Sequence, residues 1–121
     1  MEGTVTKQRR AFFRLNYPKR ARPNVRIDGD LYHVSEVSEQ GIRVVMNPRG
    51  FYHGLTLKGR LNLHQDKQIE VQGQVIRMEE TEVILKLDLG PSFRDMVQEQ
   101  RYLRQNYPSI FSRVNHQQVS K

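Results

Sequence analysis

Two groups of polar residues in this 121-residue chain have the types and spacing to bind a ligand. Arg9, Arg10 and Arg14 place three guanidinium groups within six residues, and Ser38 and Gly41 follow about 25 residues later. A guanidinium group binds phosphate or carboxylate through two parallel hydrogen bonds, and its plane stacks on aromatic rings. A serine hydroxyl donates a hydrogen bond, and glycine permits close approach or a positive φ. These residue types predict binding of an anionic, aromatic ligand and not acid–base or nucleophilic catalysis.

The positive charge is concentrated in the segment that carries the arginines. The formal net charge is +7, and eight cations occur between residues 7 and 26 without an acid, namely Lys7, Arg9, Arg10, Arg14, Lys19, Arg20, Arg22 and Arg26. The other residues nearly balance, with 12 lysines and arginines against 13 acids. Such a segment either remains in water, where it keeps the domain soluble, or meets phosphate, nucleic acid or an acidic protein face. Pro18 and Pro23 interrupt any amphipathic membrane helix here.

The chain length and composition predict one small folded module. A chain of 121 residues supports a single core. It contains no cysteine, which excludes disulfides and thiolate sites. The longest apolar runs, such as Val44–Met46, are far shorter than the roughly 20 residues of a membrane span. Met1 is followed by Glu2 with no apolar signal segment, so we expect a cytoplasmic protein without membrane insertion.

Apolar residues alternate with polar ones over most of the chain, a pattern typical of strands. The alternation runs from Val25 to Leu89, broken by turn sequences at residues 28–30, 47–50, 64–67 and 78–81. About six short strands separated by such turns favour a small antiparallel barrel. The sequence therefore predicts a mainly β fold.

The apolar spacing changes from two residues to the helical period after Gly90-Pro91. Ser92 is suited to cap a helix and Asp95 follows three residues later, while Pro108 ends the pattern. The predicted apolar face, expected to cover a mouth of the barrel, consists of Phe93, Met96, Val97, Leu103 and Tyr107. We expect residues 1–20 to form a mobile basic arm, residues 21–107 the barrel and helix, and residues 108–121 a polar tail.

No motif predicts an enzyme. Gly54 and Gly59 have the spacing of a phosphate-binding loop, but Arg60 and Leu61 replace its lysine and hydroxyl residue. The four histidines lack the spacing of metal ligands, and Ser38 lacks the G-x-S-x-G turn of serine hydrolases. We therefore expect no catalytic residue, no bound metal and no cofactor.

The ordered pair of polar motifs resembles the PilZ domain, a bacterial receptor for cyclic di-GMP. Arg10-x-x-x-Arg14 matches the RxxxR motif of that family, and Arg9 gives its common doubled form. Ser38-x-x-Gly41 matches most of its [D/N]xSxxG motif, with Glu36 in the place of Asp or Asn. The resemblance covers about residues 7–107 and implies a six-stranded antiparallel β-barrel with a C-terminal α-helix.

The resemblance implies that cyclic di-GMP is bound by Arg9, Arg10, Arg14, Glu36, Ser38 and Gly41. The ligand offers two phosphates and two guanines, whose O6 and N7 atoms a guanidinium can bind bidentately. We expect the arm to become ordered when the ligand binds and to present a new surface to an effector protein in trans. Motility, biofilm formation or secretion would then be under second-messenger control.

Two other functions remain open from the sequence. Glutamate at position 36 is compatible with a degenerate PilZ adaptor that binds a protein partner without nucleotide. A small OB-like barrel could instead bind single-stranded nucleic acid, but it would need aromatic residues on the sheet for base stacking. The segment from Ile69 to Arg77 has none, so we rank nucleic acid last.

Overall fold

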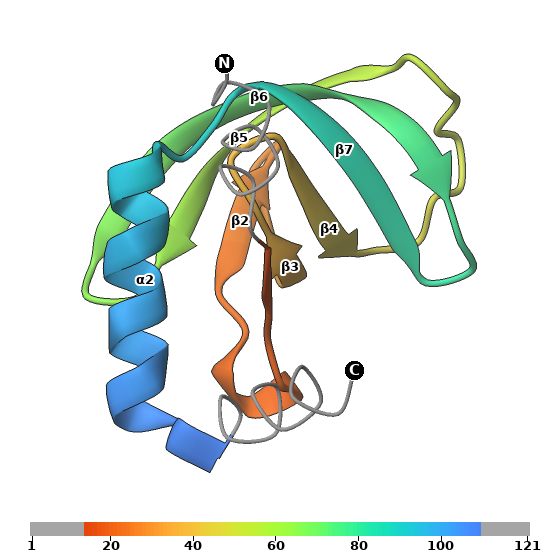
Figure 1. Cartoon of the computed structure of the whole chain (residues 1–121). Coiled ribbons are helices and arrows are strands. Elements are labelled where there is room, and N and C mark those ends of the chain that lie inside the picture. The colour runs from red at the N-terminus through yellow and green to blue at the C-terminus, as the bar shows by residue number, and fades with distance from the viewer. Residues whose placement is uncertain (1–13, 110–121) are drawn as a thin grey trace, which may run out of the picture.

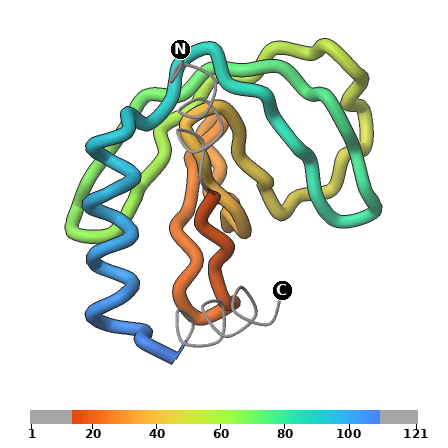
Figure 2. Tube along the Cα trace, in the orientation of Figure 1, coloured from red at the N-terminus to blue at the C-terminus, as the bar shows by residue number. Residues whose placement is uncertain are grey.

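The computed structural model describes residues 14–109, which form a β-barrel and one α-helix. The elements in chain order are β1 (Leu15–Asn16), η1 (Lys19–Ala21), β2 (Asn24–Ile27), β3 (Asp30–Val37), β4 (Gly41–Val45), β5 (Thr56–Leu63), β6 (Lys67–Met78), β7 (Glu82–Leu89) and α2 (Phe93–Asn106). Figure 1 shows the strands curling around a common interior, with α2 alongside. The path of the chain is easiest to follow in Figure 2.

Six antiparallel strands close the barrel. They are hydrogen-bonded in the order β3, β2, β5, β6, β7 and β4, and β4 pairs back onto β3. The short strand β1 lies beside the end of β3, where Leu15 is opposite Val37 and Asn16 is opposite Glu36. This architecture confirms the predicted barrel with a C-terminal helix. Closure leaves the six barrel strands without a free edge along the sheet.

The barrel interior is filled by the alternating apolar residues of the strands. Val25, Leu61, Val75 and Leu85 contribute from four different strands and are almost completely buried. Asp28 and Gly29 connect β2 to β3 with φ values of 52° and 85°. Positive φ at both central residues matches the right-handed twist of the strands, as in a type I′ turn. The alternation and the turn sequence thus act together to close the first hairpin.

Helix α2 begins at the predicted cap and packs its buried face into the barrel core. The Ser92 side chain accepts a hydrogen bond from the Asp95 backbone N–H, and the Asp95 carboxylate accepts one from the Ser92 backbone. Met96 and Leu103 belong to the core cluster, but Phe93 is 52% exposed. At about 100° per residue, Phe93 and Val97 lie toward one border of the buried helix face. The helix was predicted correctly, whereas the apolar face is rotated away from Phe93.

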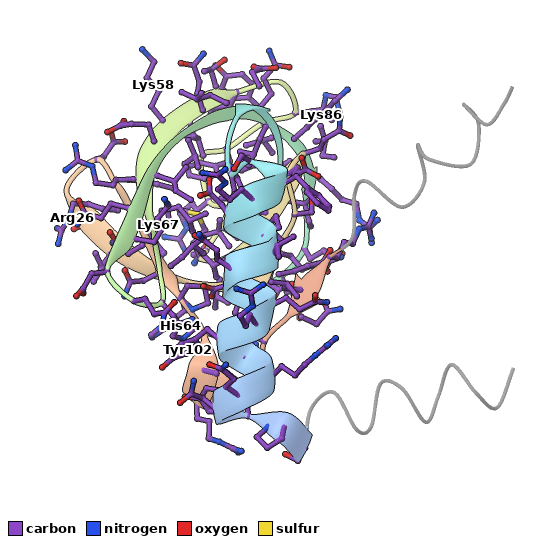
Figure 3. All side chains as sticks on the ribbon, turned by 60° about the vertical axis from the view of Figure 1, so that its left-hand side comes forward. Arg26, Lys58, His64, Lys67, Lys86 and Tyr102 are labelled. Atoms are coloured by element: carbon purple, nitrogen blue, oxygen red, sulfur yellow. The ribbon has the colours of Figure 1, made fainter. Side chains whose placement is uncertain are left out.

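The buried face of α2 includes Glu99, which was not part of the apolar face predicted from the sequence. Its carboxylate accepts hydrogen bonds from the Tyr17 hydroxyl at 2.8 Å and from the His64 backbone N–H at 3.1 Å. The His64 Nδ1 atom lies 2.6 Å from the same carboxylate. The His64 ring stacks on the Tyr102 ring, with the two ring centroids 4.6 Å apart; both residues are labelled in Figure 3. Burial of Tyr17, together with the Glu99 charge, raises the pKa of its hydroxyl, which therefore keeps its proton as the donor.

The Glu99 network joins three separate parts of the chain. Tyr17 follows β1, His64 lies in the β5–β6 turn, and Glu99 is in the middle of α2. A carboxylate that is this deeply buried is costly unless hydrogen bonds replace its lost hydration. The network therefore holds the helix against the barrel in one register.

Within residues 14–109, no helix is long and apolar enough to cross a membrane.

We expect Tyr17→Phe to lower the free energy of unfolding by about 1.5–3 kcal/mol, because it removes a hydrogen bond to a buried charged group. Urea unfolding followed by circular dichroism measures this change. Tyr52→Phe is the matched control, since Tyr52 is 60% exposed and should lose almost nothing. Equal stability of the two variants would show that the Tyr17 hydroxyl does not hold the helix.

Candidate ligand-binding site

A β-bulge in β3 turns Glu36 toward the outside of the barrel. Val34 is opposite Val44 in β4, but the next pair is Glu36 opposite Arg43, so Ser35 is an extra residue. Ser35 is buried, and its hydroxyl donates to Glu82 Oε2 at 2.9 Å. Without the extra residue, strict alternation would direct Glu36 inward and Val37 outward. The bulge therefore buries Val37 and leaves Glu36 on the surface.

A second bulge lies across the same face, in β6. Val75 is opposite Leu85 and Arg77 is opposite Ile84, which makes Ile76 the extra residue. Since Arg43 is also opposite Ile84, one row runs across four strands from Glu36 through Arg43 and Ile84 to Arg77. Directly opposite side chains on one face of a sheet are within contact range. The two bulges therefore border a shared outer surface.

The connection between β3 and β4 holds the serine–glycine motif at one end of this surface. The Ser38 backbone N–H donates to the Gly41 carbonyl at 2.9 Å, and the Ser38 hydroxyl approaches the same oxygen at 3.3 Å. Gly41 is not among the described glycines with positive φ. A Cβ at this position would lie 3.1 Å from the Leu85 carbonyl. Gly41 therefore allows the β7 backbone to approach closely, and it does not provide a positive φ.

Four of the predicted site residues line one pocket of about 350 Å³. They are Arg14, which immediately precedes β1, and Glu36, Ser38 and Gly41. The remaining lining residues come from the β3–β4 connection and from β4, β6 and β7, and are Gln40, Ile42, Arg43, Ile76, Arg77, Ile84, Leu85 and Lys86. Arg9 and Arg10, the other predicted site residues, lie outside the described part of the chain. The pocket volume falls in the range of about 300–1,000 Å³ typical of small-molecule sites.

Glu36 contacts two arginines, one on each side. Its carboxylate lies 3.5 Å from Arg14 Nε and 3.6 Å from Arg43 Nε. Arg14 is 70% exposed, so its ion pair is well solvated and weak, while Arg43 is 30% exposed. Glu36 thus joins the N-terminal strand to the barrel wall, and the contact with Arg14 is the one more easily exchanged for another anion.

Arg43 is the centre of the charge network beneath the pocket. One of its terminal nitrogens donates to Glu79 at 3.1 Å and to Glu82 at 3.0 Å. Glu79 also accepts from Arg77 at 2.8 Å. Sequence reasoning did not assign Arg43 or Arg77 to the site. The available signal was the strand alternation, which places Arg43 two residues after Gly41 on the same outer face.

The network shifts the ionisation of its members in opposite directions. The hydrogen bond to Glu82 raises the pKa of Arg43, with further support from the Glu79 and Glu36 charges. Burial of Glu82 acts to raise its pKa, but the hydrogen bonds from Arg43 and Ser35 outweigh burial and lower it. Both partners are therefore held in their charged forms.

Among residues 14–109, no cluster of three or more acidic or histidine side chains is arranged to hold a metal ion.

We expect Glu82→Gln to lower the free energy of unfolding at pH 7 by about 1–3 kcal/mol, because it weakens a partly buried charged hydrogen bond. A lowered carboxyl pKa stabilises the fold above the ordinary value of 4.5, and this contribution is lost as the pH falls through the folded-state value. The difference between the wild type and the variant should therefore shrink below pH 4.5.

Urea unfolding over a series of pH values measures this dependence. Glu80→Gln is the control, because Glu80 is exposed and lies in the β6–β7 connection, two residues before Glu82. A Glu82→Gln effect that stays constant down to the acid range would show that ionised Glu82 is not the source of the stability.

Comparisons with known proteins agree with this architecture. A search of curated proteins gives no significant match. Among solved structures, the Bacillus subtilis inhibitor of motility (MotI/DgrA) is similar with a TM-score of 0.60 and 19% identity. That match covers 78% of this chain and 50% of the Bacillus chain, so this chain spans about half the length of that protein. The Legionella uncharacterized protein Lpg0364 has a TM-score of 0.53 and 21% identity, with 78% of this chain and 96% of the other covered.

At these identities, the solved structures establish the shared fold and no more. The sequence itself matches the family model of the PilZ domain over residues 8–105, a span that includes both polar motifs, the barrel and nearly all of α2. PilZ domains are binding and adaptor modules for cyclic di-GMP. The chain therefore belongs to the PilZ domain family.

Proposed function

We propose that this protein is a cyclic di-GMP receptor that signals to a separate effector protein. The observation that carries the proposal is the meeting of Arg14, Glu36, Ser38 and Gly41 around one pocket. These residues come from two motifs more than 20 positions apart in the sequence. The barrel brings them together through the pairing of β1 with β3 and of β3 with β4.

The chemistry of the pocket matches the groups that cyclic di-GMP presents. Guanidinium groups can bind the phosphates or the O6 and N7 edge of guanine, and they can stack on the base. The exposed part of Ile76 and its neighbour Ile84 provide apolar surface for a ring face. The Glu36 carboxylate can accept hydrogen bonds from guanine nitrogens. One pocket thus offers partners for both the charged and the aromatic parts of the ligand.

Arg9 and Arg10 are close enough along the chain to complete the site. Arg10 precedes Arg14 by four residues, and four extended residues span at most about 14 Å. Because Arg14 already lines the pocket, both arginines can reach the same ligand. Ligand binding would then draw residues 9–14 over the pocket and order them at an entropic cost.

Arg14 can change partner without leaving a buried charge behind. In the free protein its guanidinium lies beside Glu36, but the pair is largely in water. If a ligand phosphate takes Arg14, Glu36 keeps its contact with Arg43. The exchange therefore replaces one weak ion pair by a phosphate contact, while Leu15 and Tyr17 keep β1 in place on the barrel.

The effector is proposed to be a protein of the motility apparatus or of a related surface process. Support comes from the structural similarity to a Bacillus protein described as an inhibitor of motility. The single-stranded nucleic acid alternative is disfavoured, because β5, β6 and β7 carry no aromatic residue on which bases could stack. The exposed aromatic residues Tyr52 and Phe93 lie in a connection and on the helix.

We expect the wild-type protein to bind cyclic di-GMP saturably and Arg14→Ala to weaken binding at least about tenfold, since one charge-assisted hydrogen bond contributes about 1.5–3 kcal/mol. Isothermal titration calorimetry measures both affinities. Arg60→Ala is the matched control, because Arg60 is 56% exposed and pairs with Glu70 away from the pocket.

The controls separate ligand recognition from general electrostatics. A loss of affinity of equal size in Arg60→Ala would show that net charge, and not the pocket, governs binding. Absence of saturable binding by the wild type at tens of micromolar cyclic di-GMP would reject the receptor function. A protein partner captured equally with and without the nucleotide would then favour the nucleotide-independent adaptor.

A further inference from the structure

The charges around the pocket balance except for one lysine. Three arginines of the lining, Arg14, Arg43 and Arg77, each contact at least one carboxylate. The carboxylates in these contacts are those of Glu36, Glu79 and Glu82. Three cations therefore face three anions, and their formal charges cancel. Lys86 is the fourth cation of the lining, and it provides the surplus positive charge.

Lys86 is exposed and lies at one end of the β7 segment that lines the pocket. It lies on β7, opposite Gly41 of β4 on one side and Gln74 of β6 on the other. Gly41 has no side chain, so nothing from that position covers the Lys86 stem. Ser38 approaches the same glycine from the β3–β4 connection, with its hydroxyl 3.3 Å from the Gly41 carbonyl. Lysine and serine therefore flank the gap that the glycine leaves.

Within the part of the chain from residue 14 to residue 109, Lys86 has no ion-pair partner. The described carboxylates within 4.0 Å of a cation are engaged by Arg14, Arg43, Arg60, His64, Lys67 and Arg77. Asp88, two residues along β7, is not among them. A phosphate that binds Lys86 therefore displaces only water, whereas one that binds the arginines must compete with a carboxylate.

We propose that Lys86 is a phosphate-binding residue of this site, and the proposal rests on the receptor function given above. An ammonium group is a compact point charge with three rotatable donors, which suits a phosphate oxygen better than the planar edge of guanine. The arginines are then left to recognise the bases and the second phosphate. Lys86 holds one phosphate against the barrel wall, close to the Ser38 hydroxyl.

Titration calorimetry with cyclic di-GMP at several salt concentrations tests the role of Lys86. We expect Lys86→Gln to weaken binding about tenfold, as for the loss of one charge-assisted hydrogen bond. The affinity of this variant should also depend less on salt, because one exposed charge no longer attracts the ligand. Lys86→Arg keeps the charge and should bind nearly as well as the wild type.

Lys58→Gln is the matched control. Lys58 is an exposed lysine of β5, and Figure 3 shows it well separated from Lys86. It carries the same charge but does not line the pocket, so its loss should leave both affinity and salt dependence unchanged. Thermal unfolding of each variant checks that the barrel is intact.

The outcomes distinguish the two proposals. Failure of the wild type to bind cyclic di-GMP would reject the receptor function and the role of Lys86 with it. Normal wild-type binding with a Lys86→Gln affinity within about twofold of it would overturn the role of Lys86 alone. An equal loss in Lys86→Arg would also overturn it, because the charge would then not be what the ligand requires.

Discussion

The site depends on one extra residue in β3. Ser35 is accommodated as a bulge opposite β4, and this changes which side chains of the strand face the core. Val34 and Val37 are both buried although they are three residues apart, an odd spacing that a regular strand cannot place on one face. The serine hydroxyl bonds to Glu82, which satisfies the polar group inside the bulge. Glu36 consequently faces the pocket while the apolar core is kept.

The same bulge determines the partners of Glu36. After the shift in register, Glu36 is opposite Arg43, and Arg43 in turn reaches the carboxylates of Glu79 and Glu82 at the β6–β7 turn. A hydrogen-bonded arginine among three carboxylates stabilises acids that would otherwise repel one another. This network connects β3, β4, β6 and β7 beneath the pocket. Outside this network, Arg14 has only the solvated pair with Glu36, and Lys86 has no ion-pair partner among residues 14–109.

The sequence was sufficient to predict the six barrel strands and the helix, and four of the six predicted site residues line one pocket. Alternation, turn residues and the Ser92 cap are local signals, and each produced the expected element. The bulge at Ser35 and the burial of Glu99 were missed because neither follows from local patterns. An extra residue in a strand shows only when the opposite strand is known, and a glutamate on a helix is normally solvated. Arg43 was missed for the same reason, since its role depends on Glu79 and Glu82, which are distant from it in the sequence.

The anchoring of β1 fixes the chain immediately after Arg14. Successive residues of a strand point to opposite faces, so Leu15 and Tyr17 face inward while Arg14 and Asn16 face outward. Tyr17 is fixed from inside by the buried Glu99, and its backbone N–H donates to the Ser35 carbonyl at 3.0 Å. Arg14 is three residues from that anchor and is held on the outside only by the solvated pair with Glu36. Because Leu15 is buried and is opposite Val37 of β3, the core holds both ends of β1, and Arg14 immediately precedes this anchored strand, beside the pocket. A change of partner at Arg14 therefore leaves the packing of Leu15 and Tyr17, and with it the position of β1, unchanged.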